Sequence, residues 1–113
     1  MGIIKCSDVS PQVIAEGRSR YVARTENLMM VVIDFKDGPA ASPDPPHTHP
    51  HEQISYVVSG EVNFYLDKVA TRLGPGDMVT VPPDVPHSIQ LLTPHVRLVD
   101  TFHPIRRDFL PRN

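Results

Sequence analysis

Short runs of apolar residues alternate with turns along most of this chain, and the spacing within the runs is typical of β-strands. Residues 52–59 show the pattern best, because their side chains fall alternately on two faces of an extended segment. One face carries Ile54, Tyr56 and Val58, and the other carries Gln53, Ser55 and Val57. Further strands are predicted over residues 27–35, 62–66, 71–73, 78–81, 88–92 and 96–102. Because a tight turn with Gly60 separates 52–59 from 62–66, we expect these two strands to pair as a hairpin.

Helices have little support in this sequence. No segment of ten or more residues has the apolar spacing of an amphipathic helix. Residues 8–15 fit a helical turn or a short strand, and residues 104–113 fit a loop or short helix packed on the domain. The 13 prolines, more than twice the usual ~5%, fall between the apolar segments. The pattern predicts one all-β domain over residues 1–113, a sandwich or a closed barrel with room for a small ligand.

The net charge and the cysteine content limit the kinds of partner and the compartment that are expected. The net charge is −2, with acidic and basic residues interspersed, so we expect a small-molecule partner and no nucleic acid. The single cysteine, Cys6, rules out a disulfide within the chain and fits a reducing compartment. No apolar run approaches the ~18 residues of a membrane span, and the first residues lack a signal-peptide pattern. We therefore expect a soluble, cytoplasmic protein without a membrane partner.

Residues 47–53 carry the strongest chemical signal. In an extended strand, His47, His49, His51 and Gln53 would all point to one side. Imidazole nitrogens are common ligands of divalent metals, so this segment predicts a metal site. A short strand cannot enclose a metal alone, and His87, which follows a glycine turn, a short strand and a proline-rich bend, is the best further ligand. Two alternatives stay open: His51 as a ligand in place of Gln53, and a one-residue shift in register that exchanges Gln53 with Glu52.

The two histidine segments together resemble the paired motifs of the cupin superfamily. The first motif is His-x-His, three or four residues, Glu, six residues and Gly, and here its positions hold His47, His49, Gln53 and Gly60, with Gln in place of Glu. The second motif falls on Gly76, Pro82, Asp84, His87 and Leu91, with Asp84 in place of Gly and Leu91 in place of Asn. The resemblance implies a double-stranded β-helix, the cupin jelly-roll barrel, with a divalent metal ion held by His47, His49, Gln53 and His87.

The carboxyl end, residues 100–110, adds a finer resemblance. With the histidine segment, it is similar to the small cupins of pectin and alginate breakdown, which convert 4,5-unsaturated monouronates into linear ketonised sugars. The Asp-x-Phe-x-x-x-Arg pattern of those proteins falls on Asp100, Phe102 and Arg106. The resemblance implies that these three are catalytic residues and that the partner is a small anionic sugar.

Alternation along residues 96–102 supports a place for Asp100 in the site independently of that resemblance. If Leu98 and Phe102 face the barrel interior, Asp100 faces it too. A buried carboxylate is costly unless a cation or a hydrogen-bond donor compensates it. A metal ion or Arg106 could do so, although Arg106 and Arg107 could equally be a solvated pair.

The donor set suggests non-redox chemistry. Three imidazoles and an amide are neutral, so a divalent cation would keep its full charge, attract anions and act as a Lewis acid. In this hypothesis the cation and Arg106 hold the sugar carboxylate, Asp100 is the general acid and base, and Phe102 packs on the sugar ring. Zinc, nickel, iron, manganese and cobalt all suit such donors. A sugar- or anion-binding cupin without turnover and an iron cupin dioxygenase are the alternative functions.

Exposed strand edges predict self-association. A single small sheet domain leaves edges that another copy commonly covers, so we expect a homodimer. Residues 3–13 could add a strand to the partner subunit.

Overall fold

The computed structural model describes residues 2–110 of the 113-residue chain. Their regular structure is almost entirely β, which confirms the predicted fold class. The strands are β1 (Gln12–Ala15), β2 (Arg18–Arg24), β3 (Met29–Phe35), β4 (Glu52–Ser59), β5 (Val62–Leu66), β6 (Val69–Leu73), β7 (Met78–Val81), β8 (His87–Leu91) and β9 (Val96–His103). Two single turns of 3₁₀-helix, η1 (Cys6–Asp8) and η2 (Arg107–Phe109), lie near the two ends. Among the described residues, no helix is long and apolar enough to cross a membrane.

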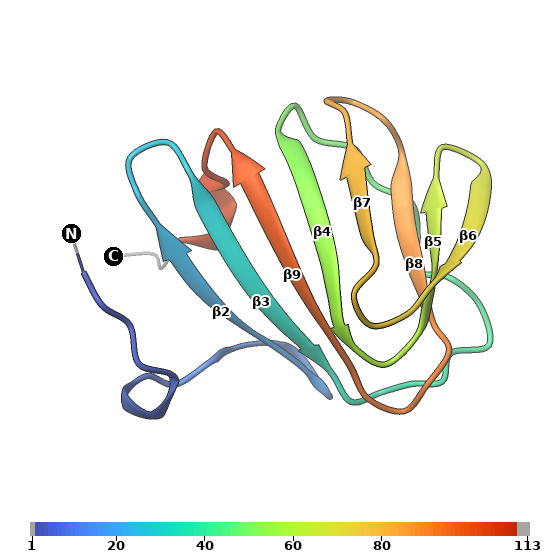
Figure 1. Cartoon of the computed structure of the whole chain (residues 1–113), viewed down its shortest axis with the longest axis horizontal. Helices are drawn as coiled ribbons and strands as arrows, with labels where there is room; N and C mark the ends of the chain where they lie inside the picture. The colour runs from blue at the N-terminus through green and yellow to red at the C-terminus, as the bar shows by residue number, and fades with distance from the viewer. Residues whose placement is uncertain (1, 111–113) are drawn as a thin grey trace.

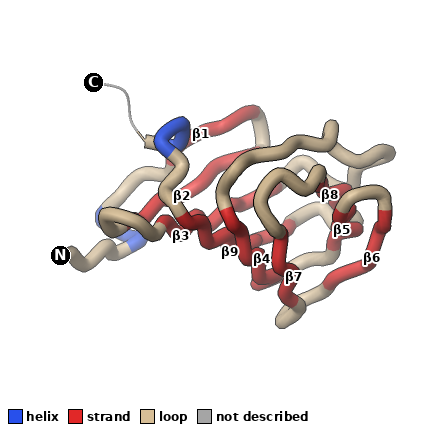
Figure 2. The backbone as a smooth tube through the Cα atoms, turned by 90° about the horizontal axis from the view of Figure 1, so that it is seen from above, coloured by secondary structure: helices blue, strands red, loops and turns tan. Residues whose placement is uncertain are grey.

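The strands form two antiparallel sheets. The large sheet has the order β1-β2-β3-β9-β4-β7, and the small sheet has the order β6-β5-β8. Figure 1 shows β2, β3, β9 and β4 following one another across the large sheet, and the view from above in Figure 2 shows β5, β6 and β8 gathered at the opposite end of the molecule. Strands distant in sequence are therefore neighbours, with β3 and β4 on either side of β9.

The predicted hairpin between β4 and β5 is wrong. Strand β4 pairs with β7 and β9, whereas β5 pairs with β6 and β8, so the turn at Gly60 carries the chain from one sheet to the other. Gly60 has a φ of 78°, and a Cβ atom there would lie 2.2 Å from the carbonyl oxygen of His95. The glycine is required by this close approach and by its backbone conformation, not by a hairpin.

The inner faces of the sheets supply two groups of buried apolar side chains. One group fills the space between the sheets and consists of Phe35, Val57, Val62, Leu91, Val96 and Leu98. The other lies toward the carboxyl-terminal turn and consists of Met29, Val31, Phe102 and Ile105. Burial of each large side chain stabilises the fold by roughly 1.5–3 kcal/mol. The apolar packing leaves the remaining inner positions, on β4, β8 and β9, for polar side chains.

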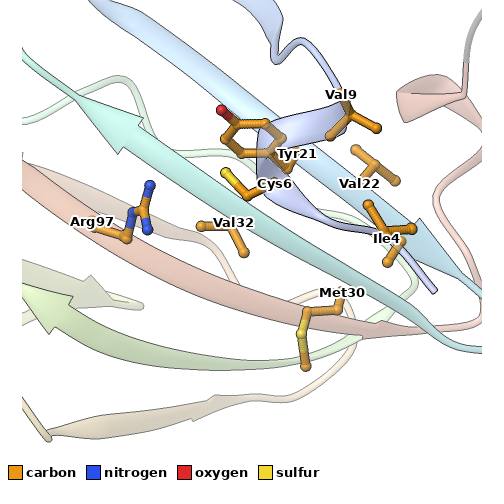
Figure 3. Close-up of a pocket in the computed structure, with 9 residues that line it drawn as sticks. Ile4, Cys6, Val9, Tyr21, Val22, Met30, Val32 and Arg97 are labelled. Atoms are coloured by element: carbon orange, nitrogen blue, oxygen red, sulfur yellow. The ribbon is translucent and has the colours of Figure 1, made fainter.

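The amino-terminal segment lies on the outer face of the large sheet. Figure 3 shows Ile4, Cys6 and Val9 of this segment beside Tyr21 and Val32 of β2 and β3, around a cavity of about 220 Å³. The outer positions of β4 and β7 lie beyond this cavity and stay exposed; they include Ile54, Tyr56, Val58 and Met78. One part of the outer face is thus covered by the chain itself, and another part is apolar and open.

Candidate metal centre

Three histidines from two segments lie close together, with His49 and His87 buried and His47 exposed. His47 and His49 lie in the loop before β4, and His87 is the first residue of β8. One ligand atom of each lies within 4.8 Å of the others, so the three are positioned to bind a metal ion. The backbones of His47 and His87 are joined by a pair of hydrogen bonds, each 3.0 Å long. The two motif segments therefore converge through backbone pairing, as well as through their side chains.

Backbone carbonyl groups fix the orientation of two of these rings. His87 Nδ1 donates to the carbonyl oxygen of Val85 at 2.9 Å, and His49 Nδ1 donates to that of His51 at 3.1 Å. Because a carbonyl oxygen only accepts, Nδ1 carries the proton in each neutral ring, and Nε2 is left with a lone pair. His87 Nε2 is buried and has no hydrogen-bond partner within the described part of the chain. A buried atom of this kind calls for a ligand, and a cation suits its lone pair.

Two of these histidines, His47 and His87, have lowered pKa values, which favours their neutral forms. Burial, followed by the neighbouring His87 and His49, lowers the pKa of His47 to about 4. Burial also lowers the pKa of His87, reinforced by the charges of His49 and Arg106 and opposed by the hydrogen bond to Val85. A neutral imidazole is the form that binds a metal, so the lowered pKa values of these two rings favour metal binding.

Gln53 offers a further donor atom from the start of β4. Its Oε1 atom lies 2.9 Å from His49 Nε2, and both side chains are buried. When the His49 ring carries one proton, Nδ1 holds it, so a lone pair of nitrogen faces a lone pair of oxygen. A cation shared by the two atoms would turn this unfavourable contact into a favourable one. Nitrogen and oxygen donors of this kind fit zinc, nickel, iron, manganese or cobalt.

His51 does not join the group. Residues 47–51 contain only the isolated bridge at His47, and the regular strand begins at Glu52. The prediction that alternate residues from His47 to Gln53 all point the same way is therefore wrong for His51, because the segment is not one extended strand. The His51 ring lies edge-on to His49, with 5.4 Å between ring centroids. Glu52 is exposed on the opposite side of β4 from Gln53, so the register shift did not occur.

Asp100 faces the interior from β9, as the alternation predicted. Its carboxylate accepts a hydrogen bond of 2.6 Å from Ser55 Oγ, which lies opposite on β4. Burial raises the pKa of Asp100 to about 6, although the hydrogen bond from Ser55 and the charge of Arg106 act in the other direction. The interior thus holds a carboxyl group that changes protonation close to neutral pH.

Aromatic rings hold Arg106 at the carboxyl-terminal side of the site. Its guanidinium carbon lies 4.1 Å from the centroid of the Phe109 ring and 5.3 Å from that of Phe102. The same group donates to both carboxylate oxygens of Asp108, from Nη2 at 2.9 Å and from Nε at 3.4 Å, which leaves the N–H groups of Nη1 available. Phe102 is buried and lies edge-on to His49 at 5.7 Å. The two aromatic residues therefore connect Arg106 to the histidine group.

These groups line one cavity of about 190 Å³ between the sheets. Among its lining residues are the predicted site residues His47, Gln53, His87, Asp100, Phe102 and Arg106. The structure thus brings six of the seven predicted residues to one space, and the seventh, His49, contacts Gln53. Ser55 and Phe109 have parts in the site that the sequence did not predict. The alternation of β4 placed Ser55 on the face of Gln53, but a single serine gives no chemical signal, and Phe109 lies in a segment without periodicity.

Residues 32–100 match a family model described as Cupin domain. The chain is 31% identical over 94 residues to the pectin degradation protein KdgF of Dickeya dadantii (strain 3937), with 82% of this chain and 83% of that protein covered. In structure it is similar to KdgF from Halomonas sp., with a TM-score of 0.88, 32% identity, and coverage of 97% of this chain and 99% of the other. It is also similar to an RmlC-like cupin from Shewanella frigidimarina NCIMB 400, with a TM-score of 0.87, 35% identity, and coverage of 97% and 96%. The similarity extends over nearly the whole chain.

Proposed function

The chain belongs to the cupin domain family, which confirms the predicted jelly-roll barrel, and from this premise we propose that it is a metal-dependent enzyme of pectin or alginate breakdown. The reaction is the conversion of 4,5-unsaturated monouronates into linear ketonised sugars. The observation that carries the proposal is that the buried carboxyl group of Asp100 lines the same cavity as His47 and His87, which lie beside His49. Burial raises the pKa of this group to about 6. Similarity to KdgF, a pectin degradation protein, supports the choice of substrate.

In this proposal His47, His49, Gln53 and His87 hold a divalent cation. All four donors are neutral, so the bound cation supplies undiminished positive charge to an anionic ligand. Arg106 adds a second positive group on the Phe109 side of the cavity, where an N–H pair can bind both oxygens of the sugar carboxylate. The substrate would be recognised by its carboxylate and oriented with its ring toward Phe102.

Asp100 serves as general acid and then as general base. Its protonated form delivers a proton to C4 of the unsaturated sugar, while water adds to C5 and returns one proton to the Asp100 carboxylate, which gives a hemiketal. The bond between C5 and the ring oxygen then breaks as Asp100 gives a proton to that oxygen and accepts the proton of the C5 hydroxyl group, so a ketone forms at C5 and a second hydroxyl group at C1. The hydrate left at C1 loses water to give the aldehyde. A pKa near 6 suits both steps, because each protonation state is accessible near neutral pH.

The direct test is to incubate purified, metal-loaded protein with unsaturated monouronates prepared with a polysaccharide lyase. Loss of the ultraviolet absorbance of the C4–C5 double bond, with a linear keto sugar as product, is the expected result. Binding of the sugar without loss of absorbance would instead indicate a sugar-binding cupin. Oxygen consumption with a catechol or flavonol, and no action on the uronate, would indicate a dioxygenase.

We also propose that the protein is a homodimer. The apolar side chains Ile54, Tyr56 and Met78 are exposed together on β4 and β7, and the register Tyr56↔Met78 makes two of them neighbours. An apolar patch of this kind commonly marks an interface with another protein. Light scattering after size exclusion is expected to give twice the chain mass of 12.6 kDa. Ile54→Asp is expected to shift the mass to that of a monomer, and a monomeric wild-type protein would contradict the proposal.

A further inference from the structure

Two buried hydrogen bonds connect the amide of Gln53 to Asp100. Gln53 Nε2 donates to Ser55 Oγ at 2.8 Å, and Ser55 Oγ donates to Asp100 Oδ1 at 2.6 Å. The side chains of all three residues are buried. A hydroxyl group has one proton, and here the ionised carboxylate of Asp100 accepts it. Ser55 therefore presents only lone pairs to residue 53, and residue 53 must offer a donor.

We propose that Ser55 and Asp100 fix which end of the residue-53 side chain faces the metal site, and that they select glutamine over glutamate at this position. The inference rests on the proposed metal site. Because the Gln53 nitrogen is committed to Ser55, the amide oxygen is the atom left beside His49 Nε2, at 2.9 Å. Ser55 is thus a positioning residue, which acts on the metal through Gln53.

A glutamate at position 53 would conflict with this arrangement. Its carboxylate has no donor, so it would either meet the lone pairs of Ser55 or take the hydroxyl proton away from Asp100. In both cases a buried carboxylate lacks a hydrogen bond, and an unsatisfied buried charge is destabilising. Gln53→Glu conserves the size and shape of the side chain, but it is unfavourable here because Asp100, two hydrogen bonds away, accepts the proton of Ser55.

The first test measures thermal unfolding of the metal-free protein at pH 8, where Asp100 is ionised. Gln53→Glu is expected to lower the Tm by roughly 5 °C, the shift that about 1 kcal/mol causes in a domain of this size. In an Asp100→Asn background the Asn amide can donate to Ser55, whose own proton then serves the introduced glutamate, so the loss should disappear. An equal loss in both backgrounds would overturn the proposal.

A Ser55→Ala background separates hydrogen bonding from charge repulsion between two carboxylates. Without the hydroxyl there is no proton to compete for, and Asp100 has already lost its donor, so Gln53→Glu should then cost clearly less than in the wild type. Repulsion alone would leave the loss unchanged in this background, and that result would contradict the proposal.

The second test titrates Zn²⁺ into metal-stripped protein. Ser55→Ala frees the Gln53 amide to rotate and is expected to raise the Zn²⁺ Kd about 10- to 100-fold. Ser88→Ala is the matched control, because Ser88 is a buried serine of the same cavity that takes no part in this chain of hydrogen bonds. Wild-type affinity in Ser55→Ala would overturn the positioning role. Failure of the wild type to bind Zn²⁺ would instead contradict the proposed metal site, while the unfolding test, done without metal, still decides the orientation.

Discussion

The two faces of strand β4 differ in the opposite sense to those of most half-buried strands, in which the apolar face is buried and the polar face is solvated. Here Gln53 and Ser55 are 6% and 2% exposed, whereas Ile54 and Tyr56 are 52% and 41% exposed. The buried polar positions continue onto β9 at Asp100, and the exposed apolar positions continue onto β7 at Met78.

Strand β4 therefore has one part that stabilises the fold and another part that belongs to the candidate site. Near Val57 the inner face is apolar and belongs to the core between the sheets. Toward Gln53 the same face gives up apolar contacts for hydrogen-bonded polar groups, a substitution that stability alone does not favour. The outer face exposes apolar area that solubility does not favour either. Both departures are explained if the inner one forms a site and the outer one an interface.

The largest effect is expected when the inner face loses its acid. Asp100→Asn keeps the size of the side chain and an acceptor for Ser55 but cannot transfer a proton. Turnover of the unsaturated uronate should fall by about 10²- to 10⁴-fold, while metal content, measured by elemental analysis, stays at the wild-type level. A variant with near-normal turnover would remove Asp100 from the chemistry and leave the inversion without its catalytic explanation.

The pH dependence of stability tests the cost of the polar inner face. Burial raises the pKa of Asp100 from 3.8 to about 6, so between these values the folded state binds more protons than the unfolded state. Stability is therefore lost as pH rises from 3.8 to 6, by about 3 kcal/mol in all, and is unaffected by this group below 3.8.

Urea unfolding of metal-free wild type and Asp100→Asn should reveal this loss. All other titratable groups are common to the two proteins, so their contribution largely cancels in the comparison. The free energy of unfolding of the variant relative to that of the wild type should increase between about pH 4 and pH 6 and stay constant above that range. A difference between the two proteins that does not change with pH would show that burial of Asp100 costs nothing.

A smaller effect on stability is expected at Val57, where the inner face of β4 is apolar and buried, as it is in most half-buried strands. Val57 is buried in the core and its neighbour Val58 points outward. Val57→Ala is expected to lower the free energy of unfolding by about 2 kcal/mol, and Val58→Ala by less than about 0.5 kcal/mol. Urea unfolding at two protein concentrations sharpens the comparison. A loss for Val58→Ala that grows with concentration would mean that a second copy covers this face.

Local pattern predicted the strands better than it predicted their partners. The bounds of β4, β5 and β7 were predicted correctly because alternation and turn residues act within a few positions. The β4–β5 hairpin was not, since Gly60 has the same appearance in a hairpin as in a crossing between sheets. The close approach of the His95 carbonyl group to Gly60 belongs to the crossing between sheets. His95 is distant from Gly60 in sequence, so a rule based on neighbouring residues cannot include it.

The site divides in a similar way. His47, His49 and His87 could be found because their residue type and spacing carry a chemical meaning. His51 has the same type and spacing, and only the irregular backbone before Glu52 excludes it. Ser55 acquires its role from the direction of a hydroxyl proton, which depends on Asp100 across the sheet, so the sequence gives no sign of it.

The two hydrogen bonds between the backbones of His47 and His87 fix the distance between these two residues. Two of the imidazoles therefore start from backbone positions whose separation is set by the fold. Binding of a metal ion should therefore need little rearrangement, and one metal ion should be able to replace another without a change in the surrounding protein. Which element occupies such a pre-set position in the cell follows from supply and intrinsic affinity more than from shape.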